Sequence, residues 1–139
     1  MNPDHYEQHL NPDKTLPEVK LYQGKKSLMS SKVQTTHHYE VLNKNNLSIG
    51  GFLLSVPNAP HPESAAFIRQ MSIRVGPHEF AQQGFGKATY LAILKRLGDT
   101  KLHSGEINEG SKKIWQWLVQ KGVAKQIDPT DATGKYETI

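Results

Sequence analysis

The chain of 139 residues contains no cysteine. Without thiols it forms no disulfide and uses no thiolate nucleophile, which fits a reducing compartment. No stretch of the sequence approaches the ~20 apolar residues of a membrane-spanning helix. The first residues, MNPDHYEQHLNPDK, lack the basic and apolar regions of a secretory signal. These absences lead us to expect a cytoplasmic protein that has no membrane partner.

A strong excess of one charge is also missing. Lys and Arg together number 17 and Asp and Glu 13, which gives a net charge of +4. The basic residues are scattered in pairs such as Lys95-Arg96 and Lys112-Lys113. Nucleic-acid-binding modules usually carry denser basic patches with aromatic residues between them. The charge pattern favours an anionic partner only weakly, and we do not expect that partner to be a nucleic acid.

Several common motifs are absent. Residues 84–87, Gly-Phe-Gly-Lys, lack the upstream glycine and the Lys-Ser/Thr ending of a Walker loop, and Thr89 replaces the third glycine of the dinucleotide fingerprint. The sequence contains no Gly-x-Ser-x-Gly elbow of a serine hydrolase. His5 and His9 stand four residues apart without a third ligand at a useful spacing, so no metal site is predicted.

The length suits one domain with a substantial core. Residues 1–17 contain three prolines and predict a polar N-terminal arm, and residues 18–139 predict the folded domain. A short strand is expected over residues 18–23. The segments HHYEVL and LSIGGFLLSV, separated by NKNN, predict two strands joined by an Asn-rich turn. The pair Gly50-Gly51 inside the second strand indicates a bulge or a close backbone approach.

The second half alternates between strand and helix patterns. Apolar alternation predicts a strand over residues 67–75, with Phe67 and Met71 on one face and Ile68 on the other. Residues 87–97 predict a helix that stops at Gly98. The segment KLHSGEI predicts a further strand. The tail AKQIDPTDATGKYETI predicts two short strands around a turn.

A second helix is predicted to begin at Ser111, acting as N-cap, and to end at Gly122. Its buried stripe is predicted to consist of Ile114, Trp115, Leu118 and Val119. Trp117 is predicted to point away from this stripe. An exposed Trp near two lysines indicates contact with a partner or self-association. The alternative is a Trp that lies flat on its own domain surface.

The loop VGPHEFAQQGFGKA, residues 75–88, joins the predicted strand to the predicted helix. A helix start presents backbone N–H groups and the positive end of the helix dipole. Glycines at this point let a ligand approach the backbone closely. The loop therefore predicts an anion site suited to a pyrophosphate. The alternative is a tight turn with no ligand.

This loop resembles the acetyl-CoA loop of the GNAT acetyltransferase superfamily. In that family an apolar strand end, often followed by proline, precedes a motif Arg/Gln-x-x-Gly-x-Gly/Ala at the helix start. The matching positions are Val75, Pro77, Gln83, Gly84, Gly86 and Ala88. The order of strands and helices after the loop also matches, so the resemblance covers roughly residues 65–139. It implies a single α/β (α+β) domain whose mixed, mostly antiparallel sheet is flanked by helices.

The resemblance implies that acetyl-CoA is a co-substrate and that the protein transfers its acyl group to an unidentified amine. The implied cofactor-binding residues are Val75, Gln82, Gln83, Gly84, Phe85, Gly86 and Lys87. Their backbone N–H groups would bind the CoA pyrophosphate, and Lys87 would add a charge. Candidates for proton transfer are Glu79, Glu106 and Tyr136.

The sequence departs from the family at three places. Ala81 replaces the Arg or Gln of the loop, Leu118 stands where many members carry a Tyr acid, and no carboxylate lies in strand 67–75. These departures favour an alternative, a catalytically inactive GNAT-fold protein used for binding or assembly with a protein partner. A virus or mobile element could encode such a protein, and its place would then be the virion or the host cytoplasm.

Overall fold

The computed structural model describes residues 6–7, 15–24, 29–58, 65–73, 84–105, 109–127 and 135–139. Its elements are β1 (Tyr6–Glu7), β2 (Val19–Gln23), β3 (Met29–Ser30), β4 (Gln34–Asn43), β5 (Ser48–Pro57), β6 (Ala65–Ile73), α1 (Phe85–Leu97), β7 (Lys101–His103), α2 (Glu109–Gln120), β8 (Ala124–Gln126) and β9 (Tyr136–Thr138).

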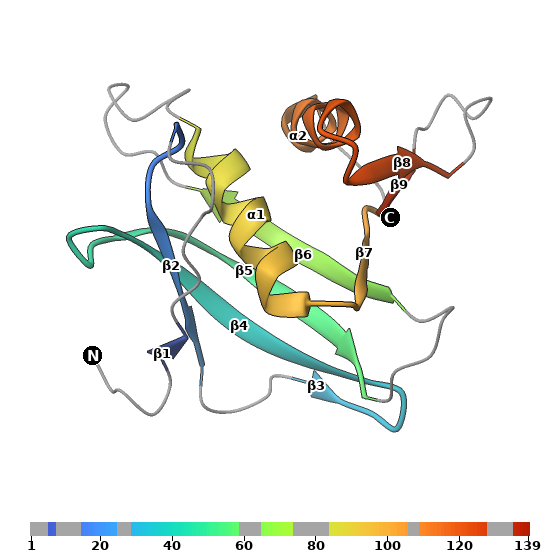
Figure 1. The fold of residues 1–139 in the computed structure, drawn as a ribbon. Coiled ribbons are helices and arrows are strands. Elements are labelled where there is room, and N and C mark those ends of the chain that lie inside the picture. The colour runs from blue at the N-terminus through green and yellow to red at the C-terminus, as the bar shows by residue number, and fades with distance from the viewer. Residues whose placement is uncertain are drawn as a thin grey trace.

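In the described ranges one sheet has the strand order β1-β2-β4-β5-β6-β7-β9-β8, with β3 beside β4 (Figure 1). β6 and β7 pair in parallel, and the other pairs are antiparallel. The expected fold class is confirmed at this level: a mixed α/β chain with a mostly antiparallel open sheet and two helices.

The predicted hairpin is formed by β4 and β5. In its turn, the Asn43 side-chain oxygen accepts hydrogen bonds from the backbone N–H groups of Asn45 and Leu47. Asn46 takes a positive φ of 64°, a conformation that asparagine tolerates better than most residues. The Asn-rich sequence thus supplies both the side-chain acceptor and the left-handed residue of the turn.

Gly51 combines the two features predicted for the glycine pair. A Cβ added to Gly51 would lie 2.9 Å from the Tyr39 backbone oxygen and 3.1 Å from His38 Nε2, so the backbones approach closely. The pairing of β5 with β6 also shifts register between Gly51 and Leu53. Both the close approach and the irregularity are confirmed.

That shift changes which residues of β6 face the core. Leu53 pairs with Arg69 and Gly51 with Ser72, so β6 contains one more residue than β5 between these two pairs. Ala66 and Ile68 face the core before the extra residue, and Met71 packs against it afterwards. The prediction that Phe67 shares the apolar face with Met71 is therefore wrong, because the bulge reverses the alternation between them.

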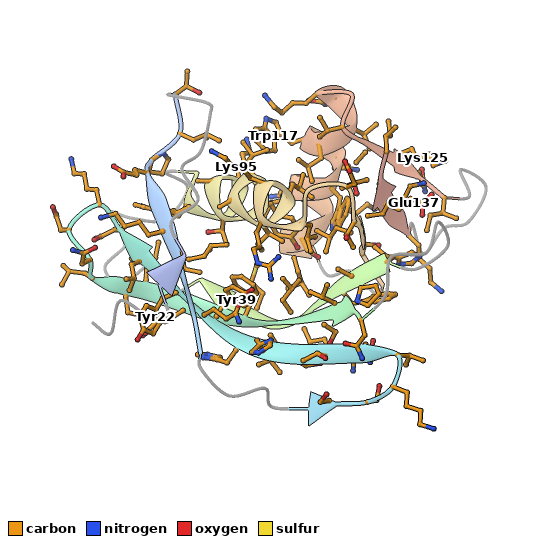
Figure 2. All side chains as sticks on the ribbon, turned by 60° about the horizontal axis from the view of Figure 1, so that its bottom comes forward. Tyr22, Tyr39, Lys95, Trp117, Lys125 and Glu137 are labelled. Carbon is orange, nitrogen blue, oxygen red and sulfur yellow. The ribbon has the colours of Figure 1, made fainter. Side chains whose placement is uncertain are left out.

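The core lies between one face of the sheet and the helices. Its largest buried side chains from the sheet are Leu21, Tyr39, Val41, Phe52, Leu54 and Leu102. From α1 it receives Ala88, Ala92 and Ile93, and from α2 it receives Trp115 and Leu118. Figure 2 shows both helices on the same side of the sheet. The opposite face carries no helix in the described part of the chain.

Two predictions about α2 need correction. The helix begins at Glu109, so Ser111 lies inside the first turn instead of capping it. Val119 is 39% exposed, whereas Trp117 is partly buried against the core. The buried arc is rotated towards Trp117 because α2 packs against α1 as well as the sheet.

The predicted N-terminal arm contacts the domain where it is described. Tyr6–Glu7 forms a strand that pairs antiparallel with β2. Leu16 packs against the core. Residues 1–5 and 8–14 of the arm lie outside the described ranges, so its boundary at residue 17 stays a prediction.

Candidate functional site

The parallel strands β6 and β7 separate after a short contact. They pair from Ala65 with Lys101 to Phe67 with His103, and β7 ends there. β6 continues to Ile73, and its described pairs beyond Phe67 are with β5 alone. Figure 1 shows β7 running towards the β8–β9 hairpin while β6 passes behind α1. One edge of β6 therefore continues beyond the reach of its neighbour.

The positive end of the α1 dipole is not offset by the N-cap or by the first turn of the helix. Gly84 is the N-cap and offers no side-chain cap, and the first turn contains no acidic residue. The first turn instead contains Lys87. Side-chain caps and acidic residues normally offset the positive end of a helix. A positive charge added at this end makes the start of α1 attractive to an anion.

Trp117 of α2 joins this region to the second helix. The Lys87 ammonium lies 5.1 Å from the centre of the Trp117 ring, and the Lys121 ammonium lies at the same distance. Figure 2 shows Trp117 on the side of α2 that faces α1. Trp117 is partly buried against the core, so the prediction that it points away from the buried stripe is wrong, and the alternative of a Trp that lies on its own domain surface is confirmed.

The two glycines have packing roles within the chain. Gly84 has a φ of 89°, and a Cβ there would lie 2.9 Å from Leu16 Cδ2. A Cβ on Gly86 would lie 3.1 Å from Ile114 Cδ1 of α2. The positive φ of Gly84 is typical of a tight turn, and Gly86 lets the two helices approach. Close approach of a phosphate to these glycines stays a prediction.

The predicted cofactor-binding residues are brought together only in part. Gly84, Phe85, Gly86 and Lys87 lie at the start of α1, and the Phe85 side chain is buried in the core. Five predicted residues lie outside the described ranges, namely Val75, Glu79, Gln82, Gln83 and Glu106.

Tyr136, the predicted proton donor, lies in β9 within the hydrophobic core. Its ring stacks on Trp115 with centroids 5.9 Å apart, and 6% of the residue is exposed. Tyr90 of α1 meets the same indole edge-on, also at 5.9 Å. Burial raises the pKa of Tyr90 to about 12, and a hydrogen bond with Trp115 opposes this rise. Both phenols therefore belong to a packed aromatic cluster that links α1, α2 and β9.

His103 is a polar residue at the site for which the sequence favoured a plain exposed position over a role in proton transfer. It lies in the last β6–β7 pair, and its ring is 5.1 Å from that of Phe67. Its Nδ1 accepts a hydrogen bond from the Gly105 N–H, which leaves the proton of the neutral ring on Nε2. Burial lowers the pKa of His103, Glu137 opposes that change and Lys135 adds to it. His103 is therefore a neutral donor where the strands separate.

The row of residues through His103 crosses several strands. His103 is the register partner of Glu137, whose carboxylate lies 3.5 Å from the Lys125 ammonium (Figure 2). On the other side of His103, Phe67 of β6 is its register partner in the same row. Facing residues in neighbouring strands share one side of a sheet. This polar row therefore lies on the helix-free face, because the neighbouring row of Ala66 and Leu102 is in the core.

No protein-family model matches the chain, and no curated protein matches it either. Within the described ranges, neither helix has the length and apolar character needed to cross a membrane. The same residues contain no group of three or more His, Asp or Glu side chains placed to hold a metal ion. The function must therefore be argued from the strand separation and the start of α1.

A cavity of about 320 Å³ lies elsewhere on the described surface. It is lined by Ser30, Ser31, Gln34 and Thr36, from β3, β4 and the turn between them. Thr36 forms a buried hydroxyl–hydroxyl hydrogen bond of 2.6 Å with Ser55. Its described lining residues carry no charge and include none of the predicted site residues.

Proposed function

We propose that the protein is an acyl-CoA-dependent N-acyltransferase that moves an acetyl group from acetyl-CoA to an amine. The separation of β6 from β7, with the positive start of α1 following β6 in the chain, is the observation that supports this function best. An extended ligand with amide groups can pair with an open strand edge. The pantetheine arm of CoA has such amides, and its pyrophosphate suits a helix start.

The helix-free face is the side from which the amine would approach in this proposal. Both helices lie on the other side of the sheet (Figure 2). The amine nitrogen attacks the thioester carbon, the CoA thiolate leaves, and the amine loses one proton. Glu79 and Glu106 follow β6 and β7 in the sequence, so a carboxylate near either strand end is our candidate to take that proton. Proximity alone could also carry part of the rate.

A specific observation favours a second candidate, a GNAT-like binding or assembly protein without catalysis. Leu118, at the position of the family's Tyr acid, is fully buried in the core. The tyrosines of this half of the chain, Tyr90 and Tyr136, pack against Trp115. A phenol held in this way is poorly placed to protonate a leaving thiolate. This candidate keeps CoA or protein-partner binding but has no acyl transfer.

Thiol release gives a direct test, because the protein contains no cysteine to add background. Acetyl-CoA is mixed with a panel of small amines, polyamines and peptides, and free CoA is measured with a thiol reagent. We expect amine-dependent release, together with stabilisation of about 3 kcal/mol at a CoA concentration ~100 times its Kd. Binding without release from any amine would support the non-catalytic candidate. Absence of binding at millimolar CoA would contradict the acyltransferase and favour assembly with a protein partner.

A further inference from the structure

We propose that His103 is a catalytic residue whose Nε2–H group donates a hydrogen bond to the thioester carbonyl oxygen and stabilises the oxyanion formed during acyl transfer. The proposal rests on the proposed function and adds a reacting group that the loop motif does not include. The hydrogen bonds that hold the imidazole where β6 and β7 separate carry this assignment.

One ring nitrogen of His103 is already used within the chain. The Gly105 backbone N–H donates to Nδ1 at 3.0 Å, so the neutral ring carries its proton on Nε2. Gly105 takes a positive φ of 59°, which turns the chain after β7 and directs this N–H back to the ring. In this tautomer Nε2 donates a hydrogen bond and has no lone pair with which to act as a base.

The turn that carries the Gly105 N–H is itself held by β9. Ser104 donates its backbone N–H to the Tyr136 oxygen at 2.8 Å, and the Ser104 hydroxyl accepts from the Tyr136 N–H at 2.8 Å. That hydroxyl also donates to the Gly105 oxygen at 3.0 Å. On the other side, the Phe67 ring lies 5.1 Å from the imidazole. These contacts orient the ring before a ligand binds, and such preorganisation makes a donor effective on an oxyanion.

The second ring nitrogen is available to a ligand. His103 is partly exposed, and among the residues that the structure describes Nε2 has no hydrogen-bond partner. Burial lowers the pKa of His103, while the charges of Glu137 and Lys135 act on it in opposite directions. The ring is therefore neutral at pH ~7, where it donates a hydrogen bond without giving up a proton.

The place of His103 in the sheet suits the reacting end of the ligand. Phe67 and His103 form the last pair of β6 with β7, and the described pairs of β6 from there to Ile73 are with β5 alone. In the proposed function the pyrophosphate lies at the start of α1, beyond Ile73, and the pantetheine arm follows the open edge of β6. The thioester at the opposite end of that arm then lies beside His103, on the face from which the amine approaches.

The reaction step is balanced without proton transfer by the imidazole. The amine nitrogen bonds to the thioester carbon, and the carbonyl electron pair moves to the oxygen, which accepts the hydrogen bond from Nε2. The carbonyl re-forms as the carbon–sulfur bond breaks and the thiolate leaves with the electron pair. The amine proton passes to a strand-end carboxylate or to water. Loss of one oxyanion donor typically lowers kcat by about 10²–10³.

Two substitutions separate this role from a purely structural one. His103→Gln keeps an amide N–H near the position of Nε2, whereas His103→Asn keeps an acceptor for the Gly105 N–H and loses the donor. We expect His103→Asn to lower kcat for amine-dependent CoA release about 10²–10³-fold, with KM for acetyl-CoA changed less than about threefold. His103→Gln should keep kcat within about tenfold of the wild-type value.

His38→Asn is the matched control. His38 is an exposed histidine of β4, and its neighbour Tyr39 is in the core, so His38 lies on the same helix-free face as His103. The substitution should leave kcat and KM unchanged. NMR shifts of the ring nitrogens add a readout that does not depend on activity, and we expect them to show the Nε2–H tautomer of His103 in the wild-type protein at neutral pH.

The outcomes distinguish this role from the proposed function. In a protein that releases CoA, an Nδ1–H tautomer would overturn the role of His103 alone. So would a loss confined to KM, or a kcat that is higher in His103→Asn than in His103→Gln. If the wild-type protein releases no CoA with any amine, the proposed function fails and the role of His103 fails with it.

Discussion

The ring of Tyr136 lies nearly parallel to the indole of Trp115, with an angle of 16° between their planes. Tyr90 meets the same indole at 82°. One residue of α2 therefore holds together a strand and a helix that are far apart in the sequence. The contact gives Tyr136 a structural role that is separate from the proton transfer predicted for its hydroxyl.

Two substitutions separate these roles of Tyr136. Tyr136→Ala removes a buried ring and should cost about 3–5 kcal/mol in the free energy of unfolding. Tyr136→Phe keeps the ring and should change that free energy by about 1 kcal/mol or less. Urea denaturation measures both values. If Tyr136→Phe also lowers amine-dependent CoA release by about 100-fold, the hydroxyl is the acid. Unchanged release would assign Tyr136 to packing alone.

Tyr90 predicts a loss of stability in alkali. Its pKa in the folded state, about 12, lies above the usual 10.0, so the folded protein keeps a proton that the unfolded chain releases. The stability from this group is complete below pH ~10 and is lost as the pH rises towards ~12. We expect urea midpoints to fall across this range, and the fall to be smaller in Tyr90→Phe. An identical fall in both proteins would assign it to other groups.

Substitution of Gly84 should change both the affinity for CoA and the stability of the fold. Gly84→Val places a branched side chain at a φ of 89° and against Leu16, so we expect it to weaken CoA binding more than Lys87→Ala does. Lys87 offers one charge that is worth about 1 kcal/mol or less. Isothermal titration measures the affinities.

A control keeps that comparison interpretable. Leu16→Ala combined with Gly84→Val relieves the 2.9 Å contact without removing the side chain from the start of α1. The double variant should regain part of the lost stability and still bind CoA weakly. Restored CoA binding in the double variant would mean that folding, and not ligand approach, explains the loss.

The two tryptophans of α2 should differ in their effects on folding. Trp115 is almost fully buried, so Trp115→Ala should cost about 3–5 kcal/mol. Trp117 is partly buried beneath two lysines, and Trp117→Ala should cost about 1–2 kcal/mol. Thermal and urea unfolding of both variants will show the order. A larger cost at Trp117 would contradict the packing described for α2.

Local patterns predicted the elements whose contacts are local. The β4–β5 hairpin follows from alternation around an Asn-rich turn, and Gly98 ends α1 as expected, donating its N–H to the Leu94 oxygen. The bulge in β6 could not be predicted, because it depends on how β5 pairs with it. Beyond the bulge, the other set of alternating residues in β6 faces the core.

The candidate site was predictable only where a motif marked it. The loop motif identified the start of α1, whereas Lys87 meets Trp117 through the packing of two helices that no spacing in the sequence reveals. His103 was missed for a similar reason. Its position where β6 and β7 separate depends on a parallel pairing of three residues, which leaves no periodic signal of its own.

The place of β9 between β7 and β8 has a consequence for synthesis on the ribosome. β8 precedes β9 in the chain but joins the sheet through it, so β8 has no described strand partner until β9 has been made. The indole of Trp115 likewise waits for the ring of Tyr136. A nascent chain paused before residue 136 would expose this apolar surface to chaperones, whereas β2, β4, β5 and β6 could already be paired.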